Sequence, residues 1–330
     1  MGIILLLLGI LILVLTFMDF FHTTLSGQGF GFMTGKVNRL LGHLILKNRN
    51  NFLFKYSGLL HLLITTLFWL LMLNFGTFLI YTSSPEMVIN SESKIPANLL
   101  ERLYYTGFVI STLGIGDFVP GNSLSRVITT ILSFSGFILL TTALTYLISV
   151  VNTVLQKKQL AIYISTLGTD ISEIYTTVIT PEGTNMIVEN TDSIREMIIK
   201  NSSNYIFFPI VQYYLSAKKE ASLELQLVRL YEVLVMLNYQ FEKDSVQNLK
   251  VNSIIATIVS YIKLGVKDRE EYDLEEDHLD DLRKFWSKYN LKYAPRTTAD
   301  KAVNATLLSS GWKWEDVYEK REKDASSFDF

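Results

Sequence analysis

The stretch that decides the fold is residues 99–120, which reads LLERLYYTGFVISTLGIGDFVP. Residues 99–111 are predicted to form a helix, and the helix leads directly into Thr112-Leu113-Gly114-Ile115-Gly116-Asp117. Glycines at 114 and 116 permit left-handed backbone angles that residues with a Cβ resist. Successive carbonyl groups of this segment can therefore point to one side. We expect a short helix that ends in a row of backbone carbonyls.

Apolar segments lie on both sides of this stretch. Residues 58–82 and 127–155 carry no charged side chain, and residues 2–18, almost all Ile, Leu and Val, barely reach the roughly 20 residues that cross a bilayer. Residues 2–18 could instead be a signal peptide, but the basic start and small-residue cleavage site of such a peptide are missing. We therefore predict three membrane helices, the third emerging as a stalk before Lys157 and Lys158.

The charges between the spans predict how the chain crosses the membrane. The basic linker 22–57 between the first two spans contains Lys36, Arg39, Lys47, Arg49 and Lys55 and has no Asp or Glu. By the positive-inside rule this segment is cytoplasmic, so the N-terminus and residues 83–121 face outward and the chain after Gln156 is cytoplasmic. Near these basic residues, Leu40, Leu41, Leu44 and Ile45 could form a helix on the inner membrane surface, or the segment could be a plain linker.

Residues 58–155 resemble the two-transmembrane-type potassium-channel pore family, on the strength of the segment 112–117 between two charge-free spans. The resemblance implies four pore loops around one axis, hence a homotetramer in the lipid bilayer. It also implies a selectivity filter with permeant K⁺, formed by Thr112, Leu113, Gly114, Ile115, Gly116 and Asp117. The family usually has Tyr or Phe where this chain has Ile115, which puts the strength of potassium selectivity in question. No cofactor is expected.

Candidate gating residues lie in the third span. Gly136 is a candidate hinge or a close-packing position, and Thr141, Thr142 and Thr145 either line the cavity or bond back to their own helix. His61, among leucines of the second span, could sense protons, but a neutral packing role is favoured. Because the spans carry no repeated Arg or Lys, no conventional voltage sensor is expected. Residues 27–31, GQGFG, do not complete a nucleotide-binding fingerprint and are predicted to be a flexible linker.

The second half of the sequence predicts a cytoplasmic all-α bundle. Apolar residues at helical spacing define one amphipathic helix that buries a single stripe: Leu223, Leu227, Leu230, Leu234, Leu237 and Phe241. A second stripe comprises Ile254, Ile255, Ile258, Tyr261 and Ile262. The acidic stretch 268–281 lacks the EF-hand spacing and is interpreted as a solvated helix start. Trp312 and Trp314 are interpreted as packing residues.

These predictions give an all-α membrane protein with four regions: an N-terminal transmembrane helix (1–21), a basic linker (22–57), a pore domain (58–155) and a cytoplasmic helical domain (156–330). The composition is 49% hydrophobic with a net charge of -2 and no cysteine, which argues against a nucleic-acid partner and excludes disulfides. No Ser, His and acid arrangement suggests an enzyme. The sequence predicts a tetrameric cation channel, and the alternative is a non-conducting membrane-anchored sensor or scaffold.

Overall fold

The structure, a computed structural model, describes residues 1–46, 56–266, 283–284, 286–289 and 297–318. Regular structure in these residues is almost entirely helical, and their two strands are short, β1 (Ile89–Asn90) and β2 (Phe118–Val119). The fold is therefore all-α, as predicted. The chain divides into two compact units, the first with residues 1–44, 58–151 and 207–210 and the second with residues 45–57, 152–206 and 211–330.

Three helices of the described chain are long and apolar enough to cross a membrane: α1 (Gly2–Leu25), α4 (Ser57–Thr82) and α6 (Ser123–Ser165). The protein is a multi-pass membrane protein. α1 extends past the predicted end at residue 18 and includes Asp19, whose carboxylate is fully engaged in hydrogen bonds described below. α6 has 43 residues, about 64 Å of helix, which exceeds the hydrocarbon thickness of a bilayer, and it continues through Lys157 and Lys158.

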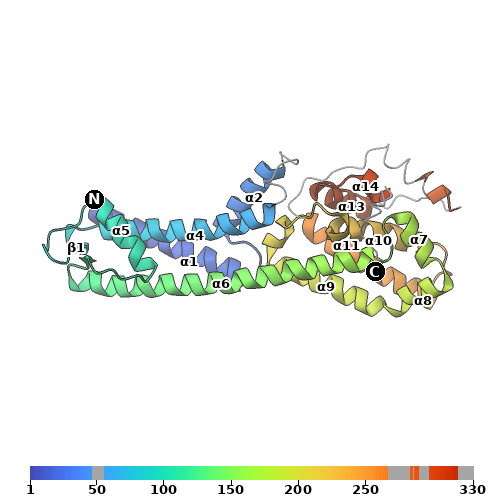
Figure 1. Ribbon diagram of the computed structural model, residues 1–330, viewed down its shortest axis with the longest axis horizontal. Helices are drawn as coiled ribbons and strands as arrows, with labels where there is room; N and C mark the ends of the chain where they lie inside the picture. Colours follow the sequence, from blue (N-terminus) through green and yellow to red (C-terminus); the bar gives the residue numbers. More distant parts are fainter. Residues whose placement is uncertain (47–55, 267–282, 285, 290–296, 319–330) are drawn as a thin grey trace, which may run out of the picture. The chain divides into compact units, whose positions relative to one another are not determined.

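In the first unit, α1 lies against α4 in the antiparallel direction (Figure 1). A Cβ added at Gly9 would lie 2.7 Å from the carbonyl oxygen of Gly76, and one added at Gly76 would lie 2.9 Å from Leu13. Two glycines at one crossing allow the helix backbones to approach closely, as is common between membrane helices. The N-terminal helix is therefore packed on the second span along its length.

The segment between α1 and α4 is partly helical, so the plain-linker alternative is wrong for α2 (Phe32–Leu46). The turn before α2 is also not the flexible linker predicted for residues 27–31. Gly27 and Gly29 have φ of 64° and 99°, and the Gly31 amide donates a 2.8 Å hydrogen bond to Thr23 Oγ1. This bond fixes the turn on α1.

From the C-terminal end of α4, the chain continues through a 3₁₀ turn, η1 (Pro85–Met87), and β1 to α5 (Leu99–Ile110). α5 matches the helix predicted for residues 99–111. β1 pairs antiparallel with β2, with Ile89 opposite Val119 and Asn90 opposite Phe118. The strand pair therefore joins the segment that precedes α5 to the segment that follows it. It holds residues 89–90 beside residues 118–119.

The second unit is a helical domain built around α10 (Leu223–Asn238). The prediction that α10 buries one stripe is wrong, because Leu223 and every residue from Leu225 to Leu237 is buried. Its neighbours cover it on several sides. They are α7 (Ile171–Val178), α11 (Val246–Val266), α13 (Thr297–Ser309), α14 (Trp314–Tyr318) and the 3₁₀ turn η3 (Lys219–Ala221). Between α7 and η3 the chain also forms α8 (Pro181–Glu189), α9 (Thr191–Phe207) and the 3₁₀ turn η2 (Pro209–Tyr213).

Two further predictions for the second unit concern described residues, and a third concerns residues outside the described part of the chain. In α11, Ile254, Ile258, Tyr261 and Ile262 are buried, as the second stripe predicted, and Ile255 packs against them partly buried. Trp314 is buried and Trp312 donates a 2.7 Å hydrogen bond to Ser222, so both tryptophans have packing roles. The acidic stretch 268–281 lies outside the described residues.

Candidate selectivity filter

The helix α5 is fixed firmly at its N-terminal end. The Asn98 side chain accepts a 3.0 Å hydrogen bond from the Glu101 amide, and Glu101 accepts a 2.7 Å hydrogen bond from the Asn98 amide. This reciprocal capping box satisfies amides that the first turn of a helix leaves unpaired. The buried guanidinium of Arg102 donates to the carbonyl oxygens of Ala97, Tyr81 and Pro85. Capping and the Arg102 contacts hold α5 against the end of α4 and set its direction.

The segment after α5 has an unusual backbone. Thr112, Gly114 and Gly116 have φ of 58°, 60° and 91°, so every second residue is left-handed. In a strand, successive carbonyls alternate between two sides. Left-handed residues at alternate positions cancel that alternation, and the carbonyls turn to one side. The two glycines carry this conformation without a Cβ penalty, whereas Thr112 carries it at a cost of about 1–3 kcal/mol.

The single chain leaves this segment uncovered. All five residues from Thr112 to Gly116 are exposed, Leu113 by 67% and Ile115 by 52%. Their side chains border an apolar hollow on α5, which is lined by Leu100, Leu103, Tyr104, Gly107, Phe108, Ser111, Leu113 and Ile115. In a membrane protein, exposed apolar surface can be covered by lipid or by another protein surface. The carbonyl segment is thus exposed at an edge of the single chain.

Residues 67–153, which contain α5, the carbonyl segment and most of both flanking spans, match the sequence model of a family described as ion channel. This part of the chain belongs to the ion-channel family. The protein is also similar to the uncharacterized membrane protein YdjJ of Bacillus subtilis (strain 168), with 28% identity over 264 residues, 77% of this chain and 76% of that protein. No solved structure matches the chain.

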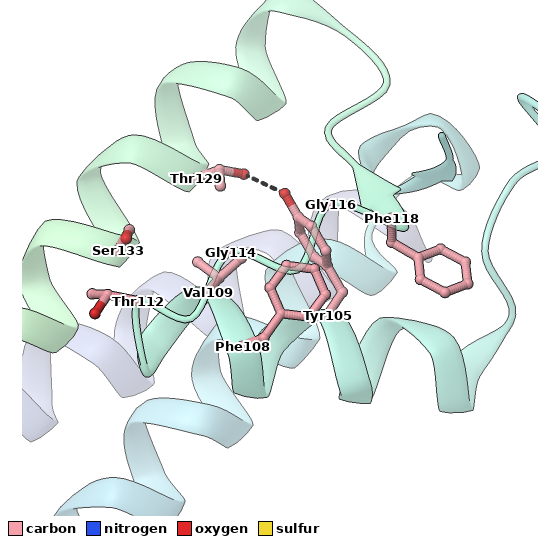
Figure 2. Close-up of a pocket in the computed structure, with 9 residues that line it drawn as sticks. All are labelled: Tyr105, Phe108, Val109, Thr112, Gly114, Gly116, Phe118, Thr129 and Ser133. Carbon is pink, nitrogen blue, oxygen red and sulfur yellow. Dashed lines mark hydrogen bonds between the residues drawn. The ribbon is translucent and has the colours of Figure 1, made fainter. Parts of the chain in front are cut away.

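Behind the carbonyl segment, the ion-channel domain contains a cavity of about 220 Å³ between α5 and α6 (Figure 2). It is lined by Tyr105, Phe108, Val109, Thr112, Gly114, Gly116, Phe118, Thr129 and Ser133. Beside it, the Thr129 hydroxyl is 2.9 Å from the Tyr81 hydroxyl and 3.2 Å from the Tyr105 hydroxyl. Three hydroxyls from α4, α5 and α6 therefore meet at one point and join the pore helix to both spans.

Ile115 lacks the hydroxyl that a tyrosine would bring to the segment, and a neighbouring side chain supplies one instead. The side chain of Tyr104 of α5 lies near Asp117, and its hydroxyl interacts electrostatically with the Asp117 carboxylate. The Tyr104 ring also packs edge-on against Phe108 and Phe118, with centroids 5.3 and 6.1 Å apart. These contacts fasten the end of the carbonyl segment to the pore helix of the same chain.

The candidate gating residues are distributed along α6. A Cβ added at Gly136 would lie 2.2 Å from the carbonyl oxygen of Ile110, so the close-packing role fits this glycine. The hydroxyl of Thr141 bonds to the carbonyls of Phe137 and Ile138, and that of Thr145 to Thr141. Thr141 and Thr145 therefore bond back to their own helix while their side chains remain exposed in the single chain. Thr142 is half-buried on the same helix.

His61 is fully buried, and its Nδ1 lies 2.8 Å from Asn38 Oδ1 of α2. This contact fits the packing role and joins two helices.

Sequence reasoning did not find the left-handed Thr112, the Tyr81–Thr129–Tyr105 hydroxyls or the Tyr104–Asp117 contact. The one related signal in the sequence is that two tyrosines, Tyr104 and Tyr105, are adjacent in the helix that precedes the segment.

Proposed function

We propose that four copies of this chain form a potassium-selective channel, with Thr112, Leu113, Gly114, Ile115 and Gly116 of each copy lining one central axis. The observation that carries the proposal is the alternation of left-handed residues at 112, 114 and 116, on an edge that the single chain leaves exposed. Backbone carbonyls turned to one side can replace the hydration shell of a dehydrated cation. A ring of four such segments gives the ion ligands on all sides.

The electrostatics around the segment favour a cation. The C-terminal end of α5 lies at Ser111, directly before the segment, and the partial negative charge of a helix C-terminus attracts positive ions. Asp117 at the other end would form a ring of four carboxylates in the tetramer. The permeant K⁺ would therefore meet negative potential at both ends of the filter.

Selectivity for potassium over sodium depends on how firmly the carbonyls are held. The carbonyls of 112–116 belong to the backbone and do not depend on the side chain at Ile115. The Tyr104–Asp117 contact holds the end of the segment, and the three hydroxyls at Thr129 hold α5 to both spans. We therefore propose that potassium preference persists, weaker than with an aromatic residue at position 115.

The proposed membrane orientation follows the positive charges. The segment 26–56 has five Lys and Arg residues and no Asp or Glu, which places it on the cytoplasmic side. The N-terminus then lies outside, beside the filter end of α4, and the second unit lies in the cytoplasm. This orientation also places Asp117 at the outer mouth of the proposed pore.

The deciding experiment is flux through the purified protein in liposomes. We expect K⁺ flux under a K⁺ gradient, and reversal potentials under paired K⁺ and Na⁺ gradients should lie nearer the K⁺ equilibrium potential. Protein-free liposomes and the Gly116→Ala variant serve as controls. Equal permeability to both ions would refute potassium selectivity, and no flux above the controls would favour a non-conducting sensor or scaffold.

A further inference from the structure

Helix α2 presents two different faces. Thr34, Asn38 and Ile45 are almost completely buried, and the side chains of Thr34 and Asn38 hydrogen-bond to side chains of α1 and α4. The opposite face exposes Phe32, Leu40 and Leu44 by 77%, 65% and 58%. Lys36 and Arg39 are exposed on this same face. The face combines large apolar side chains with two positive charges at helical spacing, a pattern typical of helices at a membrane surface.

The start of α2 is held by a carboxylate of α1. Asp19 Oδ1 accepts hydrogen bonds of 2.7 Å from the Met33 amide and 3.1 Å from the Thr34 amide. Asp19 Oδ2 accepts from the Thr34 hydroxyl and, at 3.0 Å, from Trp69 Nε1 of α4. A carboxylate at a helix N-terminus satisfies free amides and meets the positive end of the helix dipole.

One turn further along α2, a second polar contact continues this attachment. Asn38 Nδ2 donates a 2.8 Å hydrogen bond to Thr65, and Asn38 Oδ1 is the partner of His61. Both partners belong to α4. The exposed face of α2 is therefore held in a fixed position on two membrane helices, and its ordering cost is already met before any ligand binds.

The position of α2 across the thickness of the membrane follows from the length of α1 that precedes it. Gly2 packs beside Ser83 at the filter end, and Asp19 lies seventeen residues further along the helix, about 25 Å at 1.5 Å per residue. The hydrocarbon core of a bilayer is about 30 Å thick. α2 therefore begins close to the opposite boundary of the hydrocarbon, and its Lys36 and Arg39 are at the level of lipid headgroups.

The charges of this face are available to a ligand. Lys36 Nζ lies 4.0 Å from the centroid of the Phe32 ring, and neither Lys36 nor Arg39 forms an ion pair with a carboxylate in the described part of the chain. The apolar residues on the same face can pack against acyl chains. An acidic protein surface could pair with the positive charges but would offer no acyl chains to these residues. The combination fits anionic lipid better than a protein partner.

We infer that the exposed face of α2 is a binding site for anionic phospholipid, with the phosphate headgroup at Lys36 and Arg39 and the acyl chains along Phe32, Leu40 and Leu44. The assignment of this site to the cytoplasmic leaflet depends on the proposed orientation. Lipid binding itself depends neither on conduction nor on potassium selectivity. Each positive charge near a membrane surface contributes about a fivefold gain in affinity for anionic lipid.

The test is equilibrium binding of fluorescent phosphatidylglycerol to the purified full-length chain in a neutral detergent. We expect the variant Lys36→Gln/Arg39→Gln to bind about 25-fold more weakly, since two charges are lost. The matched control Lys200→Gln/Lys243→Gln removes two exposed charges from the second unit and should bind like the native chain. Fluorescent phosphatidylcholine should bind weakly to all three proteins.

A salt series gives a second readout on the native chain alone. Raising ionic strength from 0.05 to 0.5 M screens exposed charges and should weaken phosphatidylglycerol binding while leaving phosphatidylcholine unchanged. The inference is overturned if the α2 variant binds phosphatidylglycerol as tightly as the native chain, if the control variant loses as much affinity, or if the two lipids bind equally. Each of these results is readable even if the protein conducts no ions.

Discussion

At the scale of single residues, the proposed filter depends on Gly114 and Gly116, whose φ values of 60° and 91° are rarely adopted by residues that have a side chain. Gly114→Ala and Gly116→Ala should each reduce K⁺ flux in liposomes to the level of protein-free vesicles. A Cβ at these angles costs about 1–2 kcal/mol per residue, which the segment relieves by turning its carbonyls. The helices of the second unit should keep their circular dichroism.

The matched control is Gly265→Ala in α11, where the nearest atom to the added Cβ would be Tyr205 Oη at an ordinary 3.6 Å. We expect this variant to conduct like the native protein. Normal flux through both filter variants would contradict the filter assignment, and loss of flux in Gly265→Ala would show that the assay reports general damage.

Two substitutions at Ile115 can separate the effect of side-chain volume on ion selectivity from the effect of a hydroxyl group. It is half exposed beside an apolar hollow, so a larger ring has room in the single chain. Ile115→Phe adds an aromatic ring alone, and Ile115→Tyr adds the same ring with a hydrogen-bonding hydroxyl. A neutral hydrogen bond contributes about 1 kcal/mol, so we expect the K⁺/Na⁺ permeability ratio of Ile115→Tyr to exceed that of Ile115→Phe by up to about fivefold.

Reversal potentials under paired K⁺ and Na⁺ gradients measure this ratio for the native chain and both variants. Equal ratios in the Tyr and Phe variants would show that the hydroxyl contributes nothing. A lower ratio in Ile115→Tyr than in the native chain would show that Tyr104 and Asp117 already occupy the hydrogen-bonding role and that the added ring displaces them.

At the scale of elements, the Thr129 hydroxyl contacts both Tyr81 of α4 and Tyr105 of α5. Both tyrosines are almost completely buried, so Thr129→Val removes the partner of two buried hydroxyls. We expect a loss of about 1–3 kcal/mol in the free energy of unfolding, seen as a lower melting temperature of the detergent-solubilised protein. Because the pore helix loses a restraint, K⁺ selectivity should also fall.

The adjacent Thr130 provides the control for this prediction. Its exposed hydroxyl bonds only to the Arg126 carbonyl of its own helix among the described contacts, and Thr130→Val has the same change in chemistry. Its effect should stay within about 0.5 kcal/mol. Equal melting temperatures for the two variants would mean that the hydroxyl contacts at Thr129 do not stabilise the pore helix.

The elements also show what sequence alone can predict. The spans were predictable because charge-free apolar runs have few alternatives in a bilayer, and the pore helix and filter glycines followed from one motif. Contacts such as Tyr81–Thr129, which joins residues 48 positions apart, leave no local pattern in the sequence. α10 shows the same limit: its apolar stripe predicted one buried face, but helices from several other parts of the chain cover the remaining faces.

At the scale of the whole molecule, the single chain leaves its most specific feature incomplete. The carbonyl segment and the hollow on α5 are exposed, while α6 of the same chain lines the cavity behind the segment. Along α6 itself, Phe134, Phe137, Leu140 and Leu144 are each at least half exposed. Lipid can cover apolar helix faces, but it cannot pair with the carbonyls of residues 112–116. In the proposed channel, further copies of the chain and the ions between them would surround these carbonyls.

This arrangement predicts the assembly and the residues that hold it. The native complex should have four times the 37.7 kDa mass of one chain when measured by native mass spectrometry or by light scattering corrected for detergent.

Leu103 of α5 is 49% exposed in the hollow, and Leu11 of α1 is 52% exposed on the peripheral helix, so Leu103→Ala and Leu11→Ala remove the same group from similarly exposed sites. Only the first site should be covered by a second copy. Truncation of a buried leucine costs about 2–5 kcal/mol, and four such sites per ring multiply the effect, so Leu103→Ala should dissociate on heating well before the native complex. Leu11→Ala should dissociate like the native complex, because lipid or detergent replaces the lost contact. A native mass of one or two chains would overturn the tetramer, and equal dissociation of the two variants would place the contact between copies away from the α5 hollow.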